Sequence, residues 1–512
     1  MKFNLRNPLT VLGLVLLWRL GLLLFTAQPI PANDAFFYDG AVVNWLQHGH
    51  YCNPAIADLF PISGTQVFSA YPPGYQAAVL AWMSVFGTSV ISAMALHLAL
   101  FAVSGWLVLA IVSRFFPATP NYAFAALLFW GITFGDRPED LAHVLGLASL
   151  LLVVRHLAGH GGWKPAAAVA LLLLAALYTS PIPGALYFGI GLTTAALAWL
   201  GHRRSVVLAP FVAAAALFAA VTVAITRLEP LWWAGFMEVA RQQSVVTTGF
   251  HRPSGIDLLK LFRTAPVFIL SLGLAPLVLA RWRQLGGDPW LRLTAGIFVA
   301  GWGLLVADMT LIAPDYVGYV ALSQIILTAG LLALMEKCFP ARRRAGQVLL
   351  LGCAVLVSVR AAGMTTWGVA CAWKNGPAGT RAALRAELEP FTRTNTPVFL
   401  SSAYLYGAMQ SGVQYPIYAD WYFNHSTWTN HAELNGLVRF KPAKLVLTQF
   451  DYYRSFVRVL ADLRQHPELA TFQVRDRAAL RTPDSIPSLQ RVVQHISWAP
   501  VIVDLEWKPA TP

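Results

Sequence analysis

Charged side chains are scarce in this chain. Asp, Glu, Lys and Arg together make up 12% of its 512 residues, whereas soluble domains carry about 25%. Hydrophobic residues account for 57% of the sequence. A soluble protein of this composition would have too few polar groups to cover its surface. The shortage of charge therefore excludes an ordinary soluble enzyme and predicts an integral membrane protein.

Cysteine is also rare, since the chain has only four. None of them forms a C-x-x-C pair, so the sequence indicates neither a structural zinc site nor a disulfide framework.

Acidic residues are the scarcer of the two charged classes, and the formal net charge is +13. Basic chains often bind nucleic acids. Here the cations lie mostly in short loops between apolar runs, which is a sign of membrane topology rather than of a binding stripe. We expect no nucleic-acid partner.

Long apolar runs are abundant, and a run of about 20 residues spans the hydrocarbon core of a bilayer. The first run could also be read as the apolar part of a signal peptide, but it is long and lacks a clear cleavage site. The sequence predicts about eleven transmembrane helices, near Leu9–Ala27, Ser89–Phe115, Tyr122–Phe134, Leu141–Leu157, Pro165–Thr179, Pro183–Leu200, Val206–Thr226, Ala265–Ala280, Leu291–Ile312, Val317–Met335 and Gln347–Thr365.

The orientation follows from the positive-inside rule. With a cytoplasmic N-terminus, every short loop on that side is basic, with Lys2, Arg6, Arg114, Lys164, Arg203, Arg204, Arg281, Arg283, Lys337 and Arg342–Arg344. Residues 28–88, residues 227–264 and the region from residue 366 then lie outside. Cys52 and Cys371 both lie on this side, so a disulfide bond between them is an alternative that the sequence allows.

The chain divides by polarity into a transmembrane domain, residues 1–365, and a more polar C-terminal part, residues 366–512. Strand-like pieces at Val398–Ser402 and Lys444–Thr448 alternate with helix-like stretches near Thr380–Leu388 and Tyr452–Arg464. Such alternation predicts a small extracytoplasmic α/β domain.

The first outer segment begins with NDAFFYDGAVVNWLQHGHY, in which Asp34 comes soon after the first apolar run. Its AVVNWLQHG stretch predicts a short amphipathic helix along the surface, and YPPGY turns the chain back toward the bilayer. A carboxylate such as Asp34 can bind a divalent cation or deprotonate a hydroxyl group. A solvated loop carboxylate is the alternative.

The second outer loop, TFGDRPEDLAH, places Asp136, Arg137, Glu139 and Asp140 within five positions at the membrane boundary. Carboxylates there are costly unless they hold a cation or face a wet cavity. The alternative is ordinary helix capping, because an acidic residue at a helix N-terminus is favourable in its own right.

A third outer segment contains WWAGFMEVARQQ and then GFHRPSG. Its aromatic residues predict an interfacial helix, and Arg241 and Arg252 can meet a lipid phosphate. Solvated charges are the alternative. His97 and His143 lie in apolar runs, where we expect hydrogen-bonded structural roles.

The ordered series of a first helix, an outer-loop Asp, a surface helix, a YPP turn and an Arg-Pro-acid loop resembles the GT-C superfamily of polyprenyl-phosphate-dependent glycosyltransferases. Within it, the chain is similar to the protein mannosyltransferase-like and aminoarabinose transferase-like branch. The resemblance covers about the first 160 residues. It implies that Asp34 is the catalytic aspartate of the first loop, with Asp39 as an alternative, and that Glu139 is the acidic residue of the second loop.

The same resemblance pairs Glu139 with Arg137 and places Tyr71 in the family's YPP turn. It implies binding of the donor by Arg137 and Tyr71, to which we add Arg241 and Arg252 as candidate phosphate ligands from their own chemistry. We also expect a divalent cation, Mg or Mn, held by Asp34 and Glu139. Many members have Asp-Glu where this chain has Asp34-Ala35.

The resulting hypothesis is an enzyme of a bacterial inner membrane that transfers a sugar from a polyprenyl-phosphate donor to a lipid, protein or glycan acceptor on the outer side. A transporter or flippase of lipid-linked sugars is the rival, although the chain shows no two similar halves. A ligase or polymerase that uses a pyrophosphate-linked donor is a weaker alternative.

Overall fold

A computed structural model of the chain describes most of the predicted membrane region and much of the C-terminal part. The described residues are 8–26, 35–57, 60–115, 137–158, 162–202, 207–250, 266–280, 288–307, 320–338, 384–418, 437–448, 456–475 and 500–508, with the single positions 348, 352 and 452.

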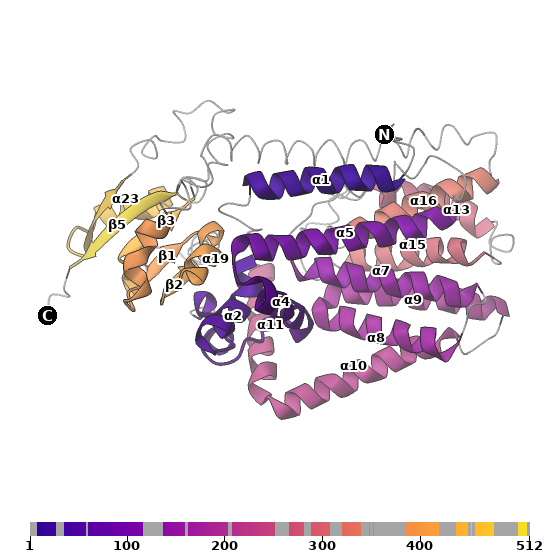
Figure 1. The fold of residues 1–512 in the computed structure, drawn as a ribbon, viewed down its shortest axis with the longest axis horizontal. Coiled ribbons are helices and arrows are strands. Elements are labelled where there is room, and N and C mark those ends of the chain that lie inside the picture. The colour runs from indigo at the N-terminus through magenta and orange to yellow at the C-terminus, as the bar shows by residue number, and fades with distance from the viewer. Residues whose placement is uncertain are drawn as a thin grey trace.

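Long helices run side by side and form a bundle (Figure 1). Each predicted apolar run coincides with a helix, except Tyr122–Phe134, which lies outside the described residues, and Gln347–Thr365, of which only positions 348 and 352 are described. The bundle helices are α1 (Pro8–Thr26), α5 (Val90–Phe115), α7 (Pro138–Leu157), α8 (Trp163–Thr179), α9 (Pro181–His202), α10 (Ala209–Leu228), α13 (Pro266–Ala280), α15 (Pro289–Ala307) and α16 (Ala321–Cys338).

Five of the described helices are long and apolar enough to cross a membrane on their own: α5, α7, α9, α10 and α15. The apolar parts of α1, α8 and α16 are shorter. Only 17% of the most apolar stretch of α10 is buried inside the protein, whereas the figure for α5 is 56%. A helix that exposes so much apolar surface needs lipid around it, and the chain is a multi-pass membrane protein.

Proline sets the beginning of many of these helices. Pro138, Pro181, Pro266 and Pro289 are each the first residue of a helix. Proline suits this position because its missing N–H would have no partner there and its φ is already helical. The position of proline in the sequence thus marks where helices begin at the two ends of the bundle.

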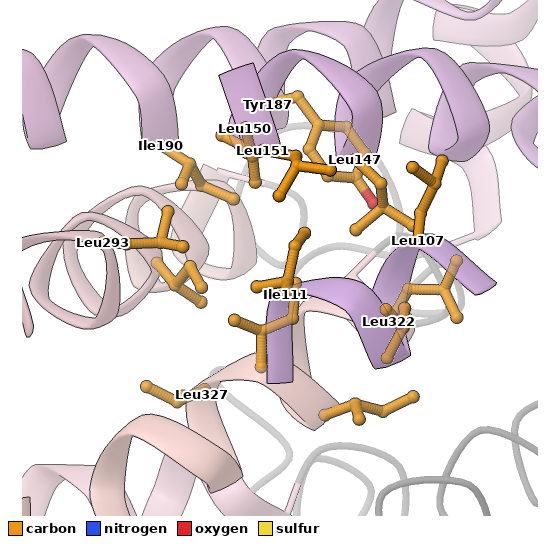
Figure 2. Packing of buried hydrophobic residues seen from close by; sticks show 14 of the residues in the cluster. Leu107, Ile111, Leu147, Leu150, Leu151, Tyr187, Ile190, Leu293, Leu322 and Leu327 are labelled. Atoms are coloured by element: carbon orange, nitrogen blue, oxygen red, sulfur yellow. The ribbon is translucent and has the colours of Figure 1, made fainter. Parts of the chain in front are cut away.

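Apolar side chains from five bundle helices interlock in the centre of the bundle (Figure 2). They include Leu107 and Ile111 of α5, Leu147, Leu150 and Leu151 of α7, Tyr187 and Ile190 of α9, Leu293 of α15, and Leu322 and Leu327 of α16. Glycine allows close approach here, because a Cβ on Gly146 would lie 2.1 Å from the ring of Tyr187. Such close packing holds the ends of the helices in fixed positions.

Further helices cover one end of the bundle (Figure 1). They are α2 (Ala35–His48), η1 (Pro54–Ile56), α3 (Pro61–Thr65), α4 (Pro73–Phe86) and α11 (Pro230–Phe250). Helix α11 runs across the direction of α8, α9 and α10 (Figure 1). The positive-inside rule predicts that this end faces outward, and we call it the outer end.

The helix expected from AVVNWLQHG is longer than predicted, and its polarity differs from a surface helix. In α2, residues Ala35, Phe36 and Ala41–Val43 are buried, while residues from Trp45 onward are exposed. Polarity therefore changes along the helix axis rather than around it. The first half of α2 is buried because it packs against α4 and against the C-terminal part of the chain.

The C-terminal part contains a five-stranded sheet in the order β2-β1-β3-β5-β4. Strands β1, β2 and β3 are parallel, whereas β5 is antiparallel to β3 and to β4. Helices α19 and α23 pack on it. The elements are β1 (Val398–Leu400), α19 (Ser402–Gln410), β2 (Pro416–Tyr418), β3 (Lys444–Leu447), α23 (Val457–Arg464), β4 (Ala470–Val474) and β5 (Val501–Trp507), with the short helix η6 (Glu389–Thr392) before them.

The two faces of the sheet bury different partners, because successive side chains of a strand point to opposite sides. Val398 and Leu400 pack into a cluster that also contains residues of α2, α4 and α19. Phe399 packs on the other face, with α23. The hydroxyl of Tyr406 also donates to the carbonyl oxygen of Thr88. The sheet thus shares a hydrophobic core with the first outer segment.

Candidate functional site

Three polar side chains meet at the outer end of the bundle. The hydroxyl of Tyr71 donates to Oε1 of Glu139 over 3.1 Å and lies 3.2 Å from Oγ of Ser180. Ser180 Oγ also donates to Oε1 of Glu139 over 3.5 Å. We call Tyr71, Glu139 and Ser180 the outer carboxylate cluster. It joins three segments that are far apart in the sequence.

Glu139 is a buried carboxylate. Glu139 is only 7% exposed, and its second carboxylate oxygen, Oε2, accepts no hydrogen bond from a described residue. Burial of a carboxylate oxygen without a donor is costly. The arrangement therefore leaves one carboxylate oxygen available for a cation, a water molecule or a substrate hydroxyl.

Local sequence explains why these groups converge. Arg137 is the extended N-cap of α7, and Pro138 starts the helix, which places Glu139 in its first turn. Ser180 is the single extended residue between α8 and α9. At the start of α4, Gly74 lies so close to α8 that a Cβ would be 2.8 Å from the carbonyl oxygen of Tyr178. Because Gly74 has no side chain, the YPP turn can pack against the connection between α8 and α9.

A second polar network lies beside the cluster. Nδ1 of His97 is 2.7 Å from Oδ2 of Asp140, and Nε2 of His97 is 2.9 Å from the hydroxyl of Tyr75. The guanidinium of Arg19 on α1 interacts electrostatically with Asp140. His143, one turn further along α7, is 2.8 Å from the hydroxyl of Tyr187. Both histidines are thus hydrogen-bonded, as we expected from their apolar surroundings.

An aromatic ring of α2 packs beside the cluster. Tyr38 lies edge to face with Tyr71, at a centroid distance of 4.8 Å, and with Tyr75, at 6.4 Å. Asp39, the alternative first-loop acid, is 1% exposed. Burial in α2 keeps Asp39 away from solvent, whereas Glu139 is somewhat more exposed.

The other predicted site residues are placed as follows. Arg137 is partly buried at the N-terminus of α7, next to the cluster in sequence, and Arg241 is exposed on α11. Asp34 and Arg252 lie outside the described residues, and Asp34 directly precedes α2 in the sequence. The structure therefore brings Tyr71 and Glu139 together and does not test the pairing of Glu139 with Asp34.

Among the described residues, no group of three His, Cys, Asp or Glu side chains could hold a metal ion. A cation site at Glu139 would need a ligand from outside these residues, and Asp34 is the candidate that the sequence offers.

Burial shifts the pKa values of several titratable groups in the outer segments, among them Glu238 and Cys52. Burial raises the pKa of Glu238 on α11, and the hydrogen bond from the backbone N–H of Ile62 opposes this effect. Burial also raises the pKa of the Cys52 thiol, against a hydrogen bond from Asn44. Cys52 is a free thiol, and Cys371 lies outside the described residues.

Sequence reasoning missed Ser180 and Tyr75. The sequence contains a signal for Ser180, because it precedes the two prolines of SPIP at the predicted outer end of an apolar run. Tyr75 gives no comparable signal, since tyrosines near a bilayer boundary are common as interfacial anchors.

No protein-family model and no curated protein matches the chain. Among solved structures, it is similar to ArnT from Cupriavidus metallidurans bound to undecaprenyl phosphate, with 15% identity and a TM-score of 0.50 over 96% of this chain and 97% of that chain. Another is the oligosaccharyltransferase AglB from Archaeoglobus fulgidus, in complex with an inhibitory peptide and a dolichol-phosphate. Its identity is 12% and its TM-score 0.49, over 94% of this chain and 75% of that chain.

An Archaeoglobus fulgidus oligosaccharyltransferase in complex with Zn and sulfate has 11% identity and a TM-score of 0.49, over 91% of this chain and 72% of that chain. At such identities the likeness concerns the fold, and ArnT matches it along nearly the whole length of both chains. The chain therefore has the fold of ArnT.

Proposed function

We propose that this protein is a membrane glycosyltransferase that moves a sugar from a polyprenyl-phosphate donor to an acceptor on the outer face of the membrane. The observation that supports the proposal is the outer carboxylate cluster at the end of a GT-C-like bundle. There, one oxygen of the buried Glu139 side chain accepts no hydrogen bond from a described residue. ArnT, which has this fold, was solved with undecaprenyl phosphate bound.

Partition of the donor explains why a site at this height suits the reaction. An isoprenoid tail stays in hydrocarbon, while its sugar-phosphate head lies at the polar boundary. Reacting groups therefore belong at the outer ends of helices, where Tyr71, Glu139 and Ser180 lie. A partly desolvated pocket also strengthens the electrostatic interactions on which transfer depends.

The proposed roles follow from charge and position. Asp34 is the general base that takes the proton of the acceptor hydroxyl group, and Glu139 orients that reaction through its free oxygen. Tyr71 fixes the direction of the Glu139 carboxylate. Arg137, Arg241 and Arg252 neutralise the departing polyprenyl phosphate, because guanidinium groups bind phosphate oxygens well.

A divalent cation such as Mg or Mn fits this site in one respect, since Oε2 of Glu139 is a buried carboxylate oxygen without a described donor. Hard cations prefer such oxygen ligands. Asp34 and Glu139 would hold the ion, which would supply charge stabilisation to the leaving phosphate.

We further propose that residues 366–512 form an extracytoplasmic α/β domain and that residues 1–365 form the transmembrane domain, in a bacterial inner membrane. The core that the sheet shares with α2 and α4 supports a role for the domain in shaping the acceptor side of the site. The acceptor is a lipid, a protein or a glycan.

Transfer by the reconstituted protein tests the proposal. The full chain in lipid vesicles is given labelled polyprenyl-phosphate sugars, and Asp34→Asn and Glu139→Gln are compared with the unchanged protein. We expect each variant to lower the transfer rate at least about a hundredfold, as loss of an acid–base group does. Glu238→Gln is the matched control, because Glu238 is an outer-face carboxylate that accepts one hydrogen bond, from Ile62, outside the cluster.

Two results would overturn parts of the proposal. Transfer that survives both substitutions removes the assignment of Asp34 and Glu139. Movement of intact labelled lipid across the bilayer without sugar transfer would show that the protein is a transporter. Transfer only from a pyrophosphate-linked donor would show that it is a ligase or polymerase.

A further inference from the structure

We infer that Asp140, His97 and Tyr75 are positioning residues that fix the first turn of α7 and thereby direct the carboxylate of Glu139 into the outer carboxylate cluster. The inference rests on the proposed function, because it assigns these residues to the site that contains Glu139.

The three side chains form a continuous chain of hydrogen bonds between three helices. An ionised carboxylate can only accept, so Nδ1 of His97 on α5 donates to Oδ2 of Asp140 on α7, over 2.7 Å. The other ring nitrogen, Nε2, is 2.9 Å from the hydroxyl of Tyr75 on α4. Hydrogen bonds at both nitrogens fix the orientation of the imidazole ring.

Asp140 and Glu139 are neighbours in the first turn of α7 and face different sides of it. Successive residues of an α-helix are about 100° apart around the axis. Asp140 therefore points to His97 while Glu139 points to Tyr71 and Ser180. Contacts on two sides prevent the turn from rotating, and the direction of one carboxylate sets the direction of the other.

Burial decides between a catalytic role and a positioning role. His97 and Tyr75 are both 0% exposed, so neither can touch a substrate. Arg19 of α1 adds a positive charge near Asp140. An isolated charge on a membrane helix is costly and is retained where it has a specific partner. The network thus connects α1, α4, α5 and α7 directly beside the site.

Tyr71 and Tyr75 also belong to one structural unit. They flank the beginning of α4, and the ring of Tyr38 contacts both of them. Tyr71 acts on Glu139 directly, whereas Tyr75 acts through His97 and Asp140. A displacement of α4 would therefore change both contacts of the first turn of α7 together.

Labelling of Glu139 by a water-soluble carbodiimide, measured by mass spectrometry, tests the inference without any enzyme activity. Glu139 is buried, so it should react slowly in the unchanged protein. We expect His97→Ala to raise its labelling about tenfold, the factor that one hydrogen bond to a charged group represents. His97→Asn, whose amide can again donate to Asp140, should restore most of the protection.

His143→Ala is the matched control. His143 is a buried histidine of α7 that contacts a tyrosine hydroxyl, as His97 does, but it does not contact Asp140 in the described structure. The His143→Ala variant should lower the Tm as His97→Ala does and leave the labelling of Glu139 unchanged. Equal labelling of Glu139 in the two alanine variants would overturn the inference, because the effect would then be general loosening of the bundle.

Kinetics in the vesicle assay provide the second measurement. His97→Ala should lower kcat about 10- to 100-fold and leave KM unchanged, since it misaligns a reacting group without touching the substrate. An effect on KM alone would overturn the positioning role. If the unchanged protein shows no transfer at all, the proposed function fails, while the labelling result still decides whether Asp140, His97 and Tyr75 hold Glu139.

Discussion

The hydroxyl of Tyr71 donates a hydrogen bond to Oε1 of Glu139 over 3.1 Å and so connects the turn before α4 with the first turn of α7. The two residues are 68 positions apart. The tyrosine hydroxyl satisfies one oxygen of this buried side chain and holds it in place. The consequences of this contact can be measured.

Tyr71→Phe removes this donor and keeps the aromatic ring. Hydrogen bonds to charged groups contribute about 1.5–3 kcal/mol, so we expect transfer to fall roughly 10- to 100-fold. Tyr178→Phe is the control, because its hydroxyl contacts Thr222 and the carbonyl oxygen of Phe218 instead of Glu139. An equal loss of activity in both variants would show that tyrosine hydroxyls matter only for stability.

Gly74→Ala tests the close approach of α4 to α8. The added Cβ would lie 2.8 Å from the carbonyl oxygen of Tyr178 and 3.1 Å from the nitrogen of Thr179, and backbone atoms cannot rotate away. Overpacking of this kind costs about 1–3 kcal/mol. We expect a lower Tm together with reduced transfer, because Tyr71 and Ser180 lie on either side of this contact.

Gly273→Ala serves as the control for Gly74→Ala, since nothing lies within 4 Å of the Cβ it would add on α13. It should leave both the Tm and the transfer rate nearly unchanged. A normal Tm for Gly74→Ala would contradict the packing described here.

Cys52 should react slowly with a maleimide in the folded protein. Cys52 is 8% exposed, and burial raises the pKa of its thiol. Less thiolate is therefore present at neutral pH than in an ordinary cysteine. The reaction rate should still increase with pH beyond the range in which a free thiol has become fully ionised. Mass spectrometry resolves the labelling of each cysteine separately.

Asn44→Ala should accelerate the labelling of Cys52. The Asn44 amide donates to the carbonyl oxygens of His50 and Cys52, over 2.9 and 3.0 Å, so its loss should loosen the segment that contains the thiol. Gln47→Ala removes a nearby side-chain hydrogen bond, to the carbonyl oxygen of Gln410, and should have no effect. Fast labelling of Cys52 in the unchanged protein would show that the thiol is not buried.

Much of the helical architecture could be predicted from local sequence. The apolar runs at Ser89–Phe115 and Pro165–Thr179 match α5 and α8 within a few residues, because hydrophobic length and proline position are local properties. The strands at Val398 and Lys444 were also predicted, since short apolar runs between turns are local signals too. The likeness to ArnT confirms the fold expected from the resemblance.

The burial of α2 could not be predicted in this way. AVVNWLQHG has the composition of a surface helix, but α19 and the C-terminal sheet cover its first half. These partners lie more than 350 residues away in the sequence, as the hydrogen bond from Gln47 to Gln410 illustrates. Local polarity carries no information about such a distant partner.

The sequence by itself determined that the chain crosses a membrane several times and which loops carry positive charge, because hydropathy and charge act residue by residue along the chain. Only the tertiary structure decided that Glu139 meets Tyr71 and Ser180 while its neighbour Asp140 meets His97. These contacts join different helices, and their geometry depends on how the helices pack and rotate against one another.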